Sequence, residues 1–191
     1  MVGILLAAGF SRRFGAENKL LQPLSDGRPI ALAAATHLIQ AIPLSIAVIR
    51  PDNEALAALL SHAGLRVVFC TEQDQEMADS LVMAIRYSAR FEEANDGFVI
   101  ALADMPYIQT STISKVATKL GNGASIVIPT YNDQRGHPVG FASRFRRELE
   151  HLHGDEGARS IIKRYPDEVH LLPCDDAGIL ADIDTKADLR G

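Results

Sequence analysis

The sequence is poor in cysteine and has no long uninterrupted apolar run. Its 191 residues include two cysteines, Cys70 and Cys174, which lie far apart in the chain. So few cysteines argue against a disulfide framework and a cysteine metal site, and they fit a reducing cytoplasm. No stretch approaches the roughly 20 apolar residues of a membrane span, and no basic segment precedes the apolar start as in a secretory signal. The sequence therefore predicts a cytoplasmic protein without a membrane partner.

The sequence also has fewer basic than acidic residues, 19 against 24, which gives a net charge of −5. This balance argues against a nucleic-acid surface, although a local basic loop remains compatible with it. The composition, 47% hydrophobic and 23% charged, is typical of a globular protein. The length suits a single domain over residues 1–191, with no internal repeat or linker.

Three familiar motifs are missing. Gly3, Gly9 and Gly15 are too widely spaced for the dinucleotide fingerprint G-x-G-x-x-G, and no Gly-Lys-Ser/Thr of a Walker loop is present. No serine lies in a G-x-S-x-G elbow, so a hydrolase triad is not indicated. A phosphate site in this chain must therefore follow another scheme.

The strongest positive pattern is an alternation of apolar, β-branched runs with segments of helical periodicity. Near-continuous apolar strands that alternate with helices predict an α/β fold with a mostly parallel sheet covered on both faces. Ligands then bind at the carboxyl ends of strands, near a topological switch point. The expected strands are 4–7, 44–49, 66–70, 98–103 and 124–128, and the expected helices are 30–42, 52–63, 80–91 and 110–120.

Several finer expectations concern helix caps and the second half of the chain. Asp52 is expected to cap the second helix, and Thr110 or Ser111 the fourth. Gly64 is expected to end the second helix in the left-handed conformation. The remaining segments are a loop over 131–136, an edge strand over 139–142, helices over 145–152 and 157–165, strands over 169–172 and 179–183, and a last helical turn.

The opening stretch, residues 3–19, carries the first candidate site. A buried strand ends at Leu6 or Ala7 and releases a loop of small and basic residues. Backbone N–H groups in such a loop can hold an anion, and Arg12, Arg13 and Lys19 add positive charge. These parts suit a triphosphate, and the alternative is an ordinary strand-to-helix turn with solvated arginines.

A second candidate is Asp104, which directly follows the apolar strand over 98–103. A carboxylate there must be solvated, hydrogen-bonded or bound to a cation. Mg²⁺ is typically held by one or two carboxylates and substrate phosphates. A capping role is the alternative, and Pro106 keeps the chain after Asp104 extended.

A third candidate is the acidic stretch over 181–185. On a strand, Asp182 and Asp184 would share one side and Ile183 would take the other. This arrangement suits a second metal ligand, and a solvated strand end is the alternative.

Two further segments offer groups for an anion or a nucleobase edge. Arg135 precedes a glycine that permits close approach, and His137 can serve as ligand, acid–base group or plain hydrogen-bonding residue. The segment over 154–159 can be a helix start capped by Asp155, or a substrate-binding helix end that includes Arg159.

Taken together and in order, these motifs resemble those of a known family. The similar segments are 6–15 with Lys19, 102–106, 135–138, 154–159 and 182–185. They are similar to the MobA-like nucleotidyltransferases of molybdenum cofactor biosynthesis, especially the molybdenum cofactor cytidylyltransferase branch. The resemblance extends over residues 3–189.

The resemblance implies a three-layer, Rossmann-like α/β fold and Mg²⁺-dependent transfer of a nucleoside monophosphate from an NTP to a phosphorylated acceptor, with release of pyrophosphate. The nucleotide implied is CTP, because the Ala-Ala-Gly form of residues 7–9 looks more like the cytidylyl branch than the paired glycines of the guanylyl branch. The acceptor implied is the molybdopterin phosphate, with a molybdoenzyme or its chaperone as a further partner.

The resemblance also implies roles for individual residues. Asp104 and Asp184 would bind the metal, and Arg13, Lys19 and Asp104 would be catalytic. Glu76 stands where relatives have glycine, which bears on nucleotide preference. The implied nucleotide-binding set is Leu6, Ala7, Ala8, Gly9, Ser11, Arg12, Lys19, Asp79 and Ser80, and the implied acceptor-binding set is Arg135, His137, Asp155 and Arg159.

Three other functions compete with this one. A guanylyl or sugar-phosphate nucleotidyltransferase would share the loop and Asp104. A non-catalytic nucleotide-binding maturation protein would bind an NTP without releasing pyrophosphate. A nicotinamide-dependent oxidoreductase is disfavoured by the missing dinucleotide fingerprint.

Overall fold

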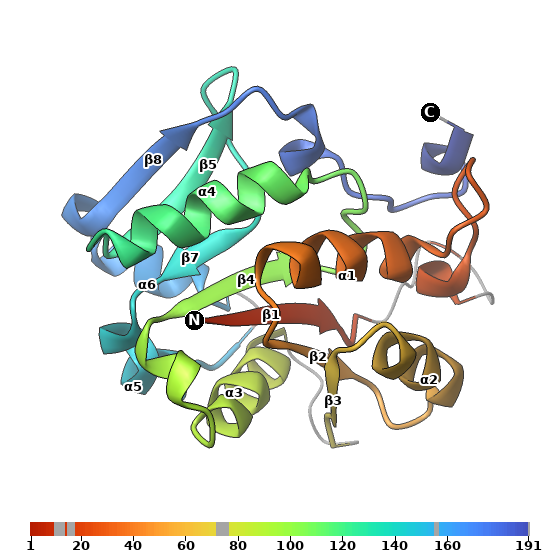
Figure 1. Ribbon diagram of the computed structural model, residues 1–191, viewed down its shortest axis with the longest axis horizontal. Coiled ribbons are helices and arrows are strands. Elements are labelled where there is room, and N and C mark those ends of the chain that lie inside the picture. The colour runs from red at the N-terminus through yellow and green to blue at the C-terminus, as the bar shows by residue number, and fades with distance from the viewer. Residues whose placement is uncertain (10–13, 15–17, 72–76, 155–156, 191) are drawn as a thin grey trace.

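The computed structural model describes residues 1–9, 14, 18–71, 77–154 and 157–190. It confirms a mixed α/β fold with a mostly parallel central sheet of eight strands in the order β3-β2-β1-β4-β7-β5-β6, with β8 beside β5 (Figure 1). The strands are β1 (Val2–Ala7), β2 (Ser45–Ile49), β3 (Arg66–Phe69), β4 (Phe98–Leu102), β5 (Ile126–Tyr131), β6 (Gln134–Arg135), β7 (Val139–Phe141) and β8 (Val169–Pro173).

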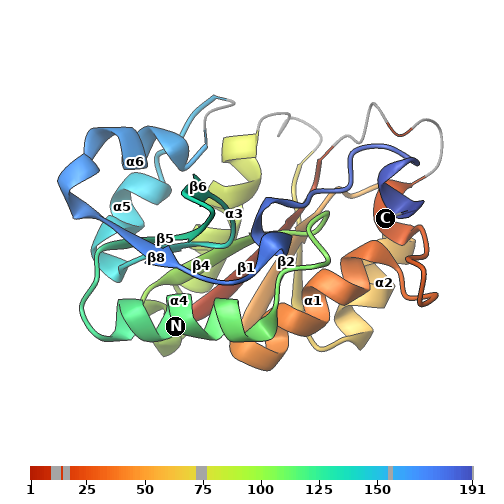
Figure 2. The ribbon, with the colours of Figure 1, turned by 90° about the horizontal axis from the view of Figure 1, so that it is seen from above.

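Helices cover both faces of this sheet, so the fold has three layers (Figure 2). One face packs under α1, α2 and α4, and the other under α3, α5 and α6. Side chains of β1 alternate between the two cores, with Ile4 on one side and Leu5 on the other. The helices are α1 (Ile30–Ala41), α2 (Glu54–His62), α3 (Met77–Ser88), α4 (Thr110–Gly121), α5 (Arg146–Leu149) and α6 (Arg159–Arg164). None of the described helices is long and apolar enough to cross a membrane.

The first half of the chain follows the predicted alternation closely. Strands β1, β2, β3 and β4 pair in parallel, and their bounds lie within two residues of the expected ones. Both flanking strands therefore bury β1 in the middle of the sheet, where its near-continuous apolar sequence is stable.

Strand β7 was expected at an edge but lies inside the sheet. It pairs antiparallel with β4 on one side and with β5 on the other. Its three residues are buried, with Gly140 between Val139 and Phe141. The short length suggested an edge strand, but tertiary pairing with two long strands overrides this local signal.

Residues 131–136 were expected to form a loop, but they form a hairpin. Asn132 and Asp133 have φ angles of 48° and 62°, which suit a two-residue turn between antiparallel strands. This turn extends β5 to Tyr131 and adds β6, which pairs with the end of β5. The short polar residues that indicated a loop are the ones that tolerate this left-handed conformation.

The residues that cap α2 and α4 differ from the expected ones. Asn53, one residue beyond Asp52, caps α2 by accepting a hydrogen bond from the Leu56 N–H at 3.3 Å. Helix α4 has no cap from Thr110 or Ser111, and Asp176 from a distant segment instead binds the residue before the helix, Gln109, and the Thr112 side chain in its first turn. The buried Asp176 carboxylate accepts from the Gln109 N–H at 2.9 Å and the Thr112 hydroxyl at 2.6 Å.

Residues 179–183 were expected to form a strand and do not. Residues Ala177–Leu180 form a 3₁₀ helix, which Asp176 begins by accepting from the Gly178 N–H at 3.0 Å. A Cβ at Gly178 would lie 2.2 Å from the Tyr107 carbonyl oxygen, so this segment packs tightly against the chain just before α4. The close approach takes the chain across the end of the sheet instead of along it.

Candidate active site

The candidate site lies where strand order reverses. Strand β1 continues to β2 on one side and pairs with β4 on the other, and Leu6 is in register with Leu102. In open α/β sheets the crevice at such a switch point is the usual ligand position. Asp104 lies two residues after Leu102, the last residue of β4, and therefore at this end of the sheet.

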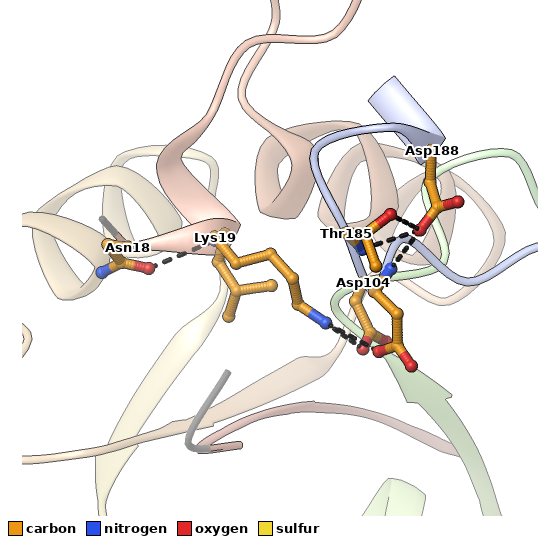
Figure 3. A network of polar contacts seen from close by, with 7 residues as sticks. Asn18, Lys19, Asp104, Thr185 and Asp188 are labelled. Carbon is orange, nitrogen blue, oxygen red and sulfur yellow. Dashed lines mark hydrogen bonds and ion pairs between the residues drawn. The ribbon is translucent and has the colours of Figure 1, made fainter. Parts of the chain in front are cut away.

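Lys19 reaches this carboxylate from the end of the opening loop. Its Nζ lies 2.9 Å from Asp104 Oδ2 and 3.5 Å from Asp184 Oδ1, and only 7% of its side chain is exposed (Figure 3). Asn18 fixes the backbone by accepting from the Leu20 N–H at 3.2 Å and by donating to Asn53 Oδ1 at 2.9 Å. The backbone before Lys19 is therefore held next to the start of α2, and the buried Lys19 ammonium reaches Asp104 at the end of the sheet.

Asp184 is brought to the site by the C-terminal segment. The Ile183 N–H donates to the Asp104 carbonyl oxygen at 2.9 Å, and the Ile183 side chain is buried. One Asp188 carboxylate oxygen accepts from the Asp184 N–H at 3.0 Å and from the Thr185 N–H at 2.7 Å (Figure 3). These hydrogen bonds, those from Thr185 foremost, lower the pKa of Asp188.

The two carboxylates are suited to a divalent metal. Among the described residues no group of three histidine, cysteine, aspartate or glutamate side chains could hold a metal ion alone. Mg²⁺, however, commonly uses one or two carboxylates and completes its shell with phosphates and water. Asp104 and Asp184 already converge on one cation, the Lys19 ammonium, which shows that their oxygens can serve a single positive charge.

The start of the opening loop lies beside these carboxylates. Ala7 is buried, Ala8 is half-buried and Gly9 is exposed. A Cβ added at Gly9 would meet no described atom within 4 Å, so packing within this part of the chain does not require a glycine there. Ser11, Arg12 and Arg13 lie outside the described residues.

A second cleft of about 500 Å³ gathers three of the predicted acceptor-binding residues. Arg135, His137 and Arg159 all line it, although they come from β6, the β6–β7 connection and α6. Asp182 also lines this cleft, whereas Asp184 two residues later reaches Lys19. The expectation that a strand would set Asp182 and Asp184 side by side is therefore wrong, because this part of the chain is not a strand.

Glycine 136 fixes the position of His137. Its N–H donates to the Pro129 carbonyl oxygen at 2.9 Å, and the His137 N–H donates to the Ile179 carbonyl oxygen at 3.0 Å. A Cβ at Gly136 would lie 2.3 Å from the Ile179 oxygen. Only glycine lets the β6–β7 connection approach the 3₁₀ helix this closely.

The His137 ring is in an unusual environment. Its Nδ1 is buried and has no hydrogen-bond partner among the described atoms. Burial lowers the pKa of His137, and the charge of Arg159 lowers it further, while Asp104 and Asp182 act in the opposite direction. The lowered pKa favours the neutral imidazole, and the buried Nδ1 is left with an unused hydrogen-bonding capacity.

A smaller and more apolar pocket of about 140 Å³ shares His137 and Arg159 with this cleft. It extends from these two residues to the end of β1, because Leu6 also lines it. The remaining lining is mostly aliphatic: Leu81, Ile100, Leu102, Val139 and Ile162.

The two other predicted nucleotide-binding residues lie apart from Lys19. Asp79 lines a different cleft of about 520 Å³, together with Arg86, Arg90 and His153. Ser80 is buried in α3. Asp155 and Glu76 lie outside the described residues.

Two residues at these sites were not anticipated. Asn18 positions Lys19 through its cap, and its place just before Lys19 and two residues before Leu20 is typical of such a cap. Lys163 lines the cleft one helical turn after Arg159. The i, i+4 spacing of these two cations on one helix could have indicated it.

Comparison with known sequences gives relatives over nearly the whole chain. Purine catabolism protein PucB of Bacillus subtilis is 28% identical, over 97% of this chain and 92% of that protein. Nicotine blue oxidoreductase of Paenarthrobacter nicotinovorans is 25% identical over the same shares. A probable molybdenum cofactor guanylyltransferase of Haloferax mediterranei is 29% identical, over 65% of this chain and 57% of that protein.

Solved structures agree with the fold. Rv0371c of Mycobacterium tuberculosis has a TM-score of 0.82 and 30% identity, over 99% of this chain and 95% of that one. Its complex with manganese has a TM-score of 0.77 and 26% identity, over 99% and 95% of the chains. A nucleotidyl transferase of Methanothermobacter, 21% identical with a TM-score of 0.80 over 98% and 93%, shows the same fold.

The family model for the MobA-like NTP transferase domain matches residues 3–169. This span includes Lys19, Asp104 and the cleft residues Arg135, His137 and Arg159. The match covers most of the chain, and the fold agrees with it. The chain is a nucleotidyltransferase and belongs to the family of MobA-like NTP transferase domains.

Proposed function

We propose that this protein transfers CMP from CTP to the phosphate of a molybdopterin-type acceptor and releases pyrophosphate. The observation that carries the proposal is the convergence of Lys19, Asp104 and Asp184 at the carboxyl ends of β1 and β4. A carboxylate pair can bind the metal, and backbone N–H groups of a glycine-containing loop can bind the triphosphate.

On the donor side, the loop after β1 would bind the triphosphate. No described atom lies within 4 Å of the position of a Cβ at Gly9, so a phosphate could approach the backbone closely there. Lys19 would stabilise the charge of the leaving pyrophosphate, together with Arg12 and Arg13. Asp104 and Asp184 would hold Mg²⁺, which when bound would polarise the α-phosphoryl group.

On the acceptor side, the cleft lined by Arg135, Arg159 and Lys163 would bind the acceptor phosphate. Guanidinium groups suit this task because they bind phosphate oxygens in pairs. The apolar pocket beside it would take a planar part of the acceptor, and the unpartnered Nδ1 of His137 would hydrogen-bond to it. A molybdoenzyme or its chaperone would then receive the product.

The chemistry would need little help from a base. An acceptor phosphate oxygen attacks the α-phosphorus, the bond from the α-phosphorus to the bridging oxygen breaks, and pyrophosphate leaves with that oxygen. Phosphate is already an anionic nucleophile at neutral pH, so positioning and charge stabilisation carry the reaction. Asp79 and Ser80 would contact the ribose if the nucleotide extends to the start of α3.

The test is pyrophosphate release measured with each of the four NTPs and purified molybdenum cofactor. We expect CTP to be the best donor, because residues 7–9 have the Ala-Ala-Gly form. The relative named as a guanylyltransferase makes GTP the second donor to compare. A clear preference for GTP would contradict the CTP assignment and leave the transferase assignment intact.

Two results would favour other functions. Tight NTP binding without pyrophosphate release from any acceptor would indicate a non-catalytic maturation protein. One relative is named as an oxidoreductase, so absorbance of NAD(P)H should be followed with the same acceptors. A steady decrease of that absorbance would indicate hydride transfer and contradict the proposed CMP transfer.

A further inference from the structure

The Lys19 ammonium has an unusual position for a residue proposed to bind a triphosphate. It is buried, and its Nζ is in contact with Asp104 Oδ2 and close to Asp184 Oδ1. The same two carboxylates are the residues that suit Mg²⁺ at this edge of the sheet. An ammonium and a divalent cation would therefore compete for the same two oxygens.

The exposure of the three side chains favours such an exchange. Asp104 is 26% exposed and Asp184 is 39% exposed, whereas Lys19 is 7% exposed. A cation from solution can therefore reach the carboxylates from outside while the ammonium approaches them from within. Lys19 is long and flexible, but Asn18 holds its backbone through the cap, so only the end of the side chain needs to move.

A displaced ammonium must find another anion. A buried charge left without a partner is strongly unfavourable. A nucleoside triphosphate bound after β1 would supply this anion. The nucleotide would draw the ammonium away from the carboxylates, and the metal would displace the ammonium toward the nucleotide. The two binding events would therefore be positively coupled.

We propose, on the basis of the proposed function, that the Lys19 ammonium occupies the metal site in the free protein and is replaced there by the divalent cation. Lys19 holds the two carboxylates until a nucleoside triphosphate draws its ammonium away. The free protein consequently binds a divalent cation weakly, and the nucleotide increases that affinity beyond what direct chelation provides. The exchange ensures that the metal enters together with its substrate.

The experiment measures Mn²⁺ binding to the full chain by electron paramagnetic resonance, without nucleotide and without acceptor. The variants are Lys19→Met and Lys19→Gln, of which the second keeps a hydrogen-bond donor in case the first fails to fold. We expect both to bind Mn²⁺ roughly tenfold more tightly, or better, than the unaltered protein. Lys186→Met is the matched control, because it removes one positive charge two residues from Asp184.

A second measurement tests the coupling. Mn²⁺ affinity is measured again with a non-hydrolysable CTP analogue bound to the unaltered protein and to Lys19→Gln. Chelation by the analogue is common to both proteins, so the difference in the gain isolates Lys19. We expect the larger gain in the unaltered protein.

Three outcomes would overturn the proposal. The first is unchanged or weaker Mn²⁺ binding by the Lys19 variants, which would make Lys19 an orienting group for the carboxylates. The second is an equal gain in Lys186→Met, which would indicate only a general effect of charge. The third is Mn²⁺ binding that Asp104→Asn does not alter, and this outcome alone would also remove the proposed metal site.

Discussion

The two halves of the sheet build their clefts in different ways. The half formed by β3, β2, β1 and β4 uses parallel strands joined by helices, and it presents Lys19, Asp104 and the start of the opening loop, residues 7–9, at one edge. The half formed by β7, β5, β6 and β8 contains antiparallel pairs, a tight hairpin and a 3₁₀ helix, and it presents Arg135, His137 and Arg159.

Under the proposed function, one half of the sheet binds the donor and the other half binds the acceptor. A repeated strand–helix unit gives a regular crevice that suits a component common to all NTPs, the triphosphate. The irregular half makes an individual cleft whose walls come from distant segments, which suits the discrimination of one acceptor from another. The predictions below separate the two halves by their effects on donor and acceptor.

Asp104→Asn should have the largest effect. Loss of the carboxylate charge removes the partner of Lys19 and the proposed metal ligand, so we expect turnover to decrease roughly a hundred- to a thousandfold. Pyrophosphate release under saturating substrates measures it. Asp133→Asn, in the exposed turn between β5 and β6, is the control and should retain normal turnover. Near-normal turnover of Asp104→Asn would refute its role in the donor half.

Arg159→Gln should affect the acceptor half alone. We expect the KM for the acceptor to rise about tenfold because one charged contact to phosphate is lost, corresponding to about 1.4 kcal/mol. The KM for the NTP should stay within a factor of about two. Arg164→Gln on the same helix is the control, since Arg164 lines none of the clefts described above. Equal changes in both KM values would show that the two clefts are not separate.

Two glycine substitutions should behave in opposite ways. Gly136→Ala places a Cβ against the Ile179 carbonyl oxygen, so it should reduce the free energy of unfolding by about 1–3 kcal/mol. Gly9→Ala meets open space and should change this free energy by less than about 0.5 kcal/mol. Urea denaturation measures both.

Their kinetic effects should also differ. Gly9→Ala should raise the KM for the NTP, because the added methyl group occupies space that a phosphate would use. A stable Gly136→Ala protein would contradict the tight contact with residue 179. A Gly9→Ala protein with unchanged nucleotide affinity would contradict the position of the triphosphate.

The pH dependence of stability should show the smallest effect. The pKa of His137 is lowered in the folded protein, so the unfolded chain binds a proton first as the pH falls through about 6.5. Acidification should therefore destabilise the fold, and His137→Asn should lose this part of the slope. Denaturation between pH 5 and pH 8 measures it, with the exposed His62→Asn as control. An unchanged slope in His137→Asn would show that this histidine titrates normally.

The fold of the first half could be predicted almost entirely from the sequence. Its strands are short apolar runs, its helices follow the hydrophobic period, and Pro29 and Gly64 mark a start and an end. These signals are local, and the structure agrees with them. The second half depends on distant contacts, such as Asp176 capping α4 and β7 inserting between β4 and β5. Local patterns contain no information on such pairings.

The site shows the same limit. Asp104 could be singled out because it directly follows a buried strand. The approach of Asp184 to Lys19 could not be derived from the spacing, since the expected strand does not exist and the backbone bond from Ile183 to Asp104 brings it there. Likewise, nothing in the sequence shows that Asp79 faces Arg86 and Arg90 in another cleft.

The central position of β7 has a consequence for synthesis of the chain. Residues 98–100 pair with residues 139–141, so the edge of β4 stays uncovered on the ribosome until the later segment has emerged. An exposed, apolar strand edge is a template for association with other chains. Nascent chains that stall, or fragments that end, between residues 102 and 138 should therefore be aggregation-prone, whereas emergence of β7 covers this edge of β4.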